Sequence, residues 1–182
     1  MILSLDTDID VNKLAEIVLK QEKRILKKYP PHSSQGKLND GNTGLGESSL
    51  TSRFNSFNVL RWKGTKELKE SILYGYKKFY PNFKGKVLVQ CWANVMRMGE
   101  KITAHRHFPE PFDNTLCGHL NVRTIGTSTY YDGEEVKNKT GEMVMFSPQI
   151  VHWTDKCIDE PRITIAFDVM PQAKKNFVTI SI

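Results

Sequence analysis

KVLVQCWANVMRM, residues 86–98, decides the fold class, because its side chains alternate between two faces with a period of two. One face is purely apolar and consists of Val89, Cys91, Ala93 and Val95. A strand with one such face packs it against a hydrophobic layer. The sequence therefore predicts a β-rich protein around this strand.

The opposite face of this strand is mixed, with Gln90, Trp92 and Asn94 on it. If the apolar face packs against helices, these three side chains line the mouth of a barrel. The alternative for Trp92 is a place in the core.

Short runs of the same period follow along the chain and are separated by Gly, Pro, Asn or Asp turns. Seven strands at this spacing favour a sandwich or barrel. They are expected at residues 86–98, 117–125, 127–132, 141–147, 150–155, 162–171 and 176–182.

Before Gly85, apolar residues recur at helical spacing in two segments, residues 11–28 and 66–80. Asp10 and Thr65 are the expected N-caps of these two amphipathic helices. The chain, residues 1–182, is expected to form a single domain. In it, residues 1–84 are a helical N-terminal support with a loop, and residues 85–182 are the β core.

The connection between the helices is rich in Gly, Ser and Asn. Its motif GNTGLGES, residues 41–48, lacks the lysine that a phosphate-binding loop carries after its last glycine. We expect residues 36–56 to form a surface loop that can fold over a site.

Composition restricts the setting of the protein. The three cysteines are widely spaced and contain no CxxC pair, and no stretch has the ~18 apolar residues of a membrane span. We expect a soluble cytoplasmic protein without a secretory signal. The net charge of +6 is spread over lysines, which favours a solvated helix face over a nucleic-acid-binding surface.

Histidines supply the strongest functional signal. His105 and His107 are two residues apart in an extended segment, so their rings project to the same side and can converge on one metal ion. Alone, this pair could equally be a polar strand end. His152, which opens a later strand after GEMVMFSPQIV, raises the odds of a metal site.

Arg162 and Thr164 share one face of the apolar strand RITIAF. A buried guanidinium is costly without an anionic partner, and its planar fork suits a carboxylate. The hydroxyl two residues on adds a donor to the same oxygens. A dicarboxylate ligand would satisfy both residues.

The order HxH, a β segment, His152 and then an arginine ten residues later resembles the 2-oxoglutarate and Fe(II)-dependent oxygenase superfamily. More narrowly, CWANVMRMGEKITAHRHFPEP, the following CGHLNV and the upstream GNTGLGESSLTSRFNSFN look like the small uncharacterised oxygenases of tailed phages of marine bacteria. The similarity covers roughly residues 40–170.

The resemblance implies a double-stranded β-helix (jelly roll) that binds Fe(II), 2-oxoglutarate and O2. Its activity would be hydroxylation of a substrate with release of succinate and CO2, in the host cytoplasm if a phage encodes it. The implied metal ligands and catalytic residues are His105, His107 and His152, with Arg162 also catalytic. Arg162 and Thr164 would hold the distal carboxylate of 2-oxoglutarate, and Asn121 would also contact this cosubstrate.

Residue 107 departs from the superfamily, which has Asp or Glu there to complete a two-histidine, one-carboxylate triad. Three neutral histidines would leave Fe(II) with its full charge, which bound dianionic 2-oxoglutarate could balance but which would alter the redox behaviour of the iron. Glu110 or Asp113 could supply the carboxylate instead. A cupin-type three-histidine dioxygenase that does not use 2-oxoglutarate, and a non-catalytic metal-binding jelly roll, are the alternatives.

His119 shares a face with Asn121 and is expected to be an interior histidine that supports the site or contacts substrate. The substrate is open, although a protein side chain or small molecule is favoured over nucleic acid. The oligomeric state is also open.

Overall fold

A computed structural model describes residues 1–31, 44–108, 113–124, 126–158, 161–172 and 178–182. Helix α1 (Val11–Lys28) begins where Asp10 accepts a hydrogen bond from the backbone N–H of Lys13, at 3.0 Å. Helix α2 (Lys66–Phe79) begins after Thr65, whose hydroxyl instead donates to the Trp62 carbonyl. Both helices are confirmed, although Thr65 does not cap through its side chain.

The strands form two antiparallel sheets. The larger sheet has the order β1-β6-β3-β8-β2-β9 and the smaller sheet has the order β5-β4-β7. In chain order the strands are β1 (Ile2–Asp6), β2 (Leu88–Met96), β3 (Leu116–Arg123), β4 (Ser128–Tyr131), β5 (Glu134–Lys137), β6 (Glu142–Phe146), β7 (His152–Thr154), β8 (Arg162–Met170) and β9 (Ile180–Ser181).

Two strands were not expected from the sequence. β1 pairs with β6 at one edge of the larger sheet, so residues 1–84 are not only helix and loop. β5 forms a hairpin with β4. The expected strand 176–182 is shorter, because residues 173–177 lie outside the described part of the chain and β9 pairs with β2 through Ile180–Ser181.

Residues 102–105 extend the smaller sheet beyond β7. The backbone N–H of His105 donates to the His152 carbonyl at 3.1 Å, and the N–H of His152 donates back at 2.9 Å. Farther along, Thr154 N–H donates to the Ile102 carbonyl at 3.1 Å. The chain therefore alternates between the larger and the smaller sheet as it passes through β2, residues 102–105, β3 and β4.

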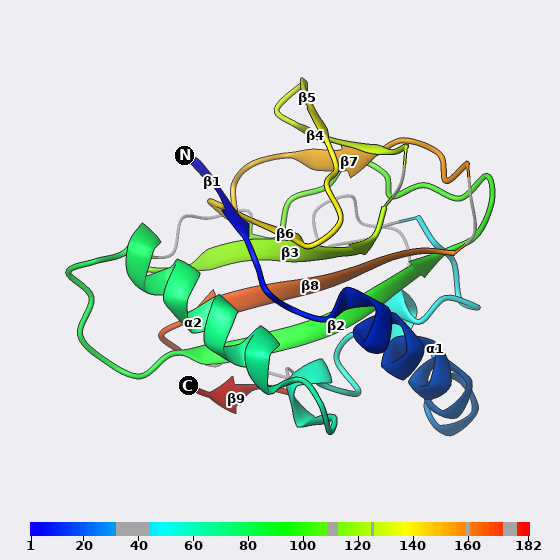
Figure 1. The fold of residues 1–182 in the computed structure, drawn as a ribbon, viewed down its shortest axis with the longest axis horizontal. Coiled ribbons are helices and arrows are strands. Elements are labelled where there is room, and N and C mark those ends of the chain that lie inside the picture. Colours follow the sequence, from blue (N-terminus) through cyan, green and yellow to red (C-terminus); the bar gives the residue numbers. More distant parts are fainter. Residues whose placement is uncertain (32–43, 109–112, 125, 159–160, 173–177) are drawn as a thin grey trace.

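Helices α1 and α2 cover the outer face of the larger sheet (Figure 1). Their apolar residues form one core with the outward-facing residues of β2, β8 and β3, among them Val89, Ile165 and Leu120. The apolar face expected for β2 therefore packs as predicted. No helix in the described ranges has the length and apolarity needed to cross a bilayer.

The other face of the larger sheet carries polar rows across β2, β8 and β3. One row is Asn94, Thr164 and Asn121, and the next is Trp92, Ala166 and His119. Trp92 belongs to the core and also lines the cavity described below, so both interpretations of this residue hold. These rows place polar side chains from three neighbouring strands between the two sheets.

Gly118 on β3 is required by close packing. A Cβ there would lie 2.6 Å from the Val144 carbonyl oxygen and 2.6 Å from the Phe167 ring. We expect Gly118→Ala to lower the free energy of unfolding by about 1–3 kcal/mol, because a buried strand and ring must shift. Urea denaturation measures this change, with Gly85→Ala as the control, because Gly85 is exposed, has no positive φ and would meet only the Phe83 ring, at 3.1 Å.

Candidate metal centre and anion site

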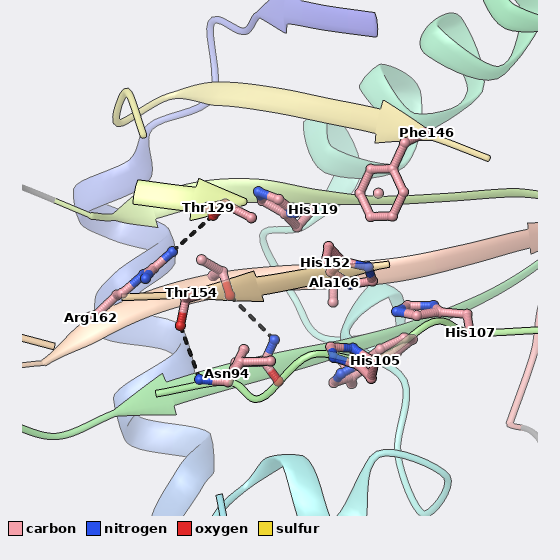
Figure 2. Close-up of a pocket in the computed structure, with 14 residues that line it drawn as sticks. Asn94, His105, His107, His119, Thr129, Phe146, His152, Thr154, Arg162 and Ala166 are labelled. Atoms are coloured by element: carbon pink, nitrogen blue, oxygen red, sulfur yellow. Dashed lines mark hydrogen bonds between the residues drawn. The ribbon is translucent and has the colours of Figure 1, made fainter. Parts of the chain in front are cut away.

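A cavity lies between the two sheets and contains about 470 Å³ of space free of protein atoms, part of it open to solvent. Histidines gather at one end of it and Arg162 lies at the other (Figure 2). The lining residues are Trp92, Asn94, Ile102, His105, His107, Gly118, His119, Thr129, Phe146, His152, Thr154, Arg162, Thr164 and Ala166.

The three histidines singled out in the sequence converge. One ring nitrogen from each of His105, His107 and His152 lies within 4.8 Å of the others. The His152 ring centroid is 4.3 Å from that of His105 and 5.1 Å from that of His107. The backbone pair between His105 and His152 holds two of these rings side by side. The arrangement could hold one transition-metal ion.

Hydrogen bonds give all three histidines the same tautomer. Nδ1 of His105 faces the Thr103 carbonyl at 2.8 Å, and Nδ1 of His152 faces the Ile150 carbonyl at 3.2 Å. Nδ1 of His107 faces the carboxylate of Asp168. Carbonyl and carboxylate oxygens only accept, so each Nδ1 carries the proton. Each Nε2 therefore keeps a lone pair for a metal.

Burial lowers the pKa of His105 to about 4, and the nearby His107 adds to this effect. Burial also lowers the pKa of His152 well below its ordinary value, with His105 and His107 contributing. Both imidazoles are therefore neutral at physiological pH. Metal coordination requires this protonation state.

Asp168 was not expected at the site. It lies on β8, two positions beyond Ala166 on the inward face, and it is buried. Of the two candidate acids, Glu110 lies outside the described residues, and Asp113 is exposed and does not group with the three histidines. Among the described residues, the carboxylate that contacts one of the three histidines is that of Asp168, at Nδ1 of His107.

Arg162 is only 3% exposed. Its Nη2 donates to the Thr129 hydroxyl at 3.3 Å, while Nε and Nη1 have no hydrogen-bond partner among the described residues. Among the described residues, none of the ion pairs includes Arg162. Burial lowers the pKa of Arg162 to about 10, so it remains charged at neutral pH. The expected anion-binding arginine is thus buried, charged and short of an acceptor.

Two further polar residues lie near Arg162 in the larger sheet. Asn121 is fully buried, and among the described residues neither atom of its side-chain amide has a hydrogen-bond partner. It lies directly across from Thr164 in the sheet register, but it is not one of the residues that line the cavity. The Thr164 hydroxyl is 3.3 Å from Asn94 Nδ2, and Thr51 donates to Asn94 Oδ1 at 2.7 Å. Because Thr164 accepts from Asn94, its own proton is available to an anion.

His119 lies between the two ends of the cavity. Its Nε2 is 3.4 Å from the buried Tyr131 hydroxyl, and it does not group with the other histidines as a ligand. Burial lowers its pKa to about 3, with Arg162 and His107 adding to the effect. His119 is therefore an interior neutral histidine with one edge on the cavity.

This pKa predicts a pH effect on stability. A histidine with a lowered pKa in the folded protein binds a proton more readily when unfolded, so stability falls as pH drops below 6.5. The metal-free protein should lose stability between pH 7 and 5.5, and His119→Gln should make this loss smaller by about 1 kcal/mol. Urea denaturation at both pH values measures it. An unchanged pH dependence would contradict the buried neutral state.

No family model and no curated protein matches the sequence. Solved structures do match. The viral collagen prolyl hydroxylase of Paramecium Bursaria Chlorella virus-1, in its 2OG complex, aligns with a TM-score of 0.61 at 11% identity, over 93% of this chain and 96% of that one. The fold is that of the 2-oxoglutarate and Fe(II)-dependent oxygenases.

Two bacterial proteins support this assignment of the fold. A prolyl-4-hydroxylase from Pseudomonas putida aligns with a TM-score of 0.56 at 11% identity, over 94% of this chain and 92% of that one. An oxidoreductase of the 2OG-Fe(II) oxygenase family from Burkholderia pseudomallei aligns at 0.53 and 12% identity, over 96% and 86%. The expected jelly roll is therefore present, flanked by the two helices.

Proposed function

We propose that the protein is an Fe(II)- and 2-oxoglutarate-dependent dioxygenase that hydroxylates a substrate with release of succinate and CO2. One observation carries the proposal: a single cavity joins three imidazole Nε2 atoms at one end to a buried, unpaired guanidinium at the other. A metal ion alone would leave the guanidinium unexplained. A carboxylate-bearing metal chelator would satisfy both ends.

The residues present fit both groups. His105, His107 and His152 would hold the iron through nitrogens that already carry lone pairs. Arg162 would bind the distal carboxylate of 2-oxoglutarate through Nε and Nη1, which lack acceptors in the described part of the chain. Thr164 and Asn121 would add a hydroxyl and an amide donor.

When bound, iron and 2-oxoglutarate supply the oxidising chemistry with O2. The chain's own contribution is binding, orientation and exclusion of water. Arg162 and Thr164 fix the end of the cosubstrate that does not react, and the backbone pair between His105 and His152 fixes two ligands. Trp92 and Phe146 supply apolar walls that keep the cavity poor in water.

A cupin-type dioxygenase with three histidines and no 2-oxoglutarate is the second candidate, and the three-imidazole cluster itself favours it. That candidate gives no role to Arg162. A non-catalytic metal-binding jelly roll has the same difficulty, because a structural metal site has no need of an arginine that binds a carboxylate. Arg162 is nevertheless held in the cavity by a hydrogen bond to Thr129, 33 residues away in sequence.

Anaerobic titration tests the proposal. Fe(II) and 2-oxoglutarate together are expected to give a weak visible charge-transfer band that neither gives alone, and slow succinate formation should follow admission of air. Zn(II) in place of Fe(II) is the control and should give neither. Folded protein that binds Fe(II) without developing the band would support the second candidate.

For the substrate we propose only a class, namely a protein side chain or a small molecule. Two of the similar structures are a viral collagen prolyl hydroxylase and a bacterial prolyl-4-hydroxylase, but the likeness to them is one of fold. The narrower link to phage oxygenases also stays a prediction.

A further inference from the structure

Among the described residues, the buried carboxylate of Asp168 forms no ion pair with a lysine or arginine. Its side chain is 5% exposed, and within the described ranges its one ion-pair partner is Nδ1 of His107, whose side chain is 9% exposed. Burying an unpaired carboxylate costs several kcal/mol. The position of Asp168 on a buried strand therefore calls for a role that involves His107.

The three histidines differ in what fixes them. His105 and His152 donate from Nδ1 to backbone carbonyls two residues earlier in their own segments, Thr103 and Ile150. These carbonyl acceptors are neutral. His107 alone donates to a charged acceptor, which comes from a strand 61 residues away in sequence. Position 107 is also the one where the oxygenases that the sequence resembles carry a carboxylate.

We propose that Asp168 is a positioning residue that supplies, through the His107 ring, the negative charge that a three-histidine metal site lacks. The inference rests on the proposed function in assuming that these histidines hold a metal. A carboxylate bonded to Nδ1 fixes the ring orientation and makes Nε2 a stronger donor to the metal. The three histidines and Asp168 together then carry the same net charge as two histidines and one carboxylate. In this arrangement the His107 ring separates the carboxylate from the ion.

A different grouping must be separated from this one. His107, Cys117 and Asp168 also lie within 4.8 Å of one another and could themselves hold a metal. In that case Asp168 would be a direct ligand, the Cys117 thiolate would be another, and His152 would not take part. In the arrangement proposed here, Cys117 is dispensable for metal binding and His152 is not.

Co(II) affinity measures the contribution without any turnover. We expect Asp168→Asn to weaken Co(II) binding by about 10–100-fold, the usual loss for a partner of a ligating histidine. Cys117→Ala, at the neighbouring position in the sheet register, is the matched control and should stay within twofold of the unsubstituted protein. Equal losses in both variants would show the other grouping and overturn the proposal.

A double-mutant cycle tests whether Asp168 acts through residue 107. His107→Asp removes the ring through which Asp168 would act, so in that background Asp168→Asn should change Co(II) affinity by no more than about a few-fold. The same substitution should therefore cost much affinity only where the His107 ring is present. A loss of similar size in both would mean that Asp168 acts on the site as a whole, and the proposal would be wrong.

Two further measurements distinguish failure of this proposal from failure of the proposed function. Urea denaturation of metal-free Asp168→Asn checks that the variant is folded, and the Co(II) visible spectrum should shift if ligand strength at His107 changes. If the unsubstituted protein binds no Co(II), the proposed function itself fails. If it binds Co(II) and Asp168→Asn binds equally well with an unchanged spectrum, only the role of Asp168 fails.

Discussion

Arg162→Leu is expected to weaken 2-oxoglutarate binding by about 100-fold or more while leaving Co(II) affinity within a few-fold. Loss of a desolvated charge pair costs about 2–5 kcal/mol, and within the described ranges Nε and Nη1 of Arg162 have no competing acceptor. Titration of the Co(II)-loaded protein with 2-oxoglutarate measures the change. Little effect on metal affinity is expected, because Arg162 lies at the opposite end of the cavity from His105, His107 and His152 (Figure 2).

The same substitution should affect stability in the opposite direction. A buried guanidinium without a carboxylate partner destabilises the ligand-free protein, so its replacement by leucine should leave the free energy of unfolding unchanged or raise it. Arg162→Lys keeps the charge but loses the planar fork, and should recover only part of the affinity. If Arg162→Leu destabilises ligand-free protein and binds 2-oxoglutarate normally, the arginine is structural.

His152→Ala is expected to reduce Co(II) and Fe(II) affinity by more than about 100-fold. This is more than the loss expected when only a hydrogen-bond partner of a ligating histidine is removed. His152 is the central member of the cluster, because its ring lies closer to each of the other two than they lie to each other, at 4.3 and 5.1 Å against 5.5 Å. Removing it also leaves His105 and His107 without a third nitrogen. Competition with a coloured chelator measures the affinity.

His119→Gln is the matched control for this loss, since His119 is a buried histidine of the same cavity that does not join the cluster. It should retain metal affinity within a few-fold. Comparable losses in both variants would indicate that the cavity collapses when any histidine is removed, and that His152 is not a ligand.

Much of the fold could be predicted from periodicity. Residues 11–28 and 66–80 alternate at helical spacing, and both helices form within one residue of those bounds. β1 was missed because it is a five-residue edge strand whose pairing with β6 is 136 residues or more distant in sequence. Such long-range pairing leaves no local signal.

The site was predictable where side-chain spacing sufficed. The pair His105 and His107 and the later His152 converge, and Arg162 is buried as expected. Asp168 was missed, although a signal existed: it is the one acid of the strand RITIAFDVM and falls on the same face as Arg162 and Thr164. Its contact with His107 depends on three-dimensional placement and could not be predicted from spacing.

The mutual backbone hydrogen bonds between His105 and His152 have a consequence for how an ion arrives. Because ordinary sheet pairing holds both ring-bearing segments together, the conformational entropy of ordering them is lost during folding and is not lost again on ion capture. Uptake should therefore proceed with a small heat-capacity change, and an emptied protein should be ready to reload without refolding.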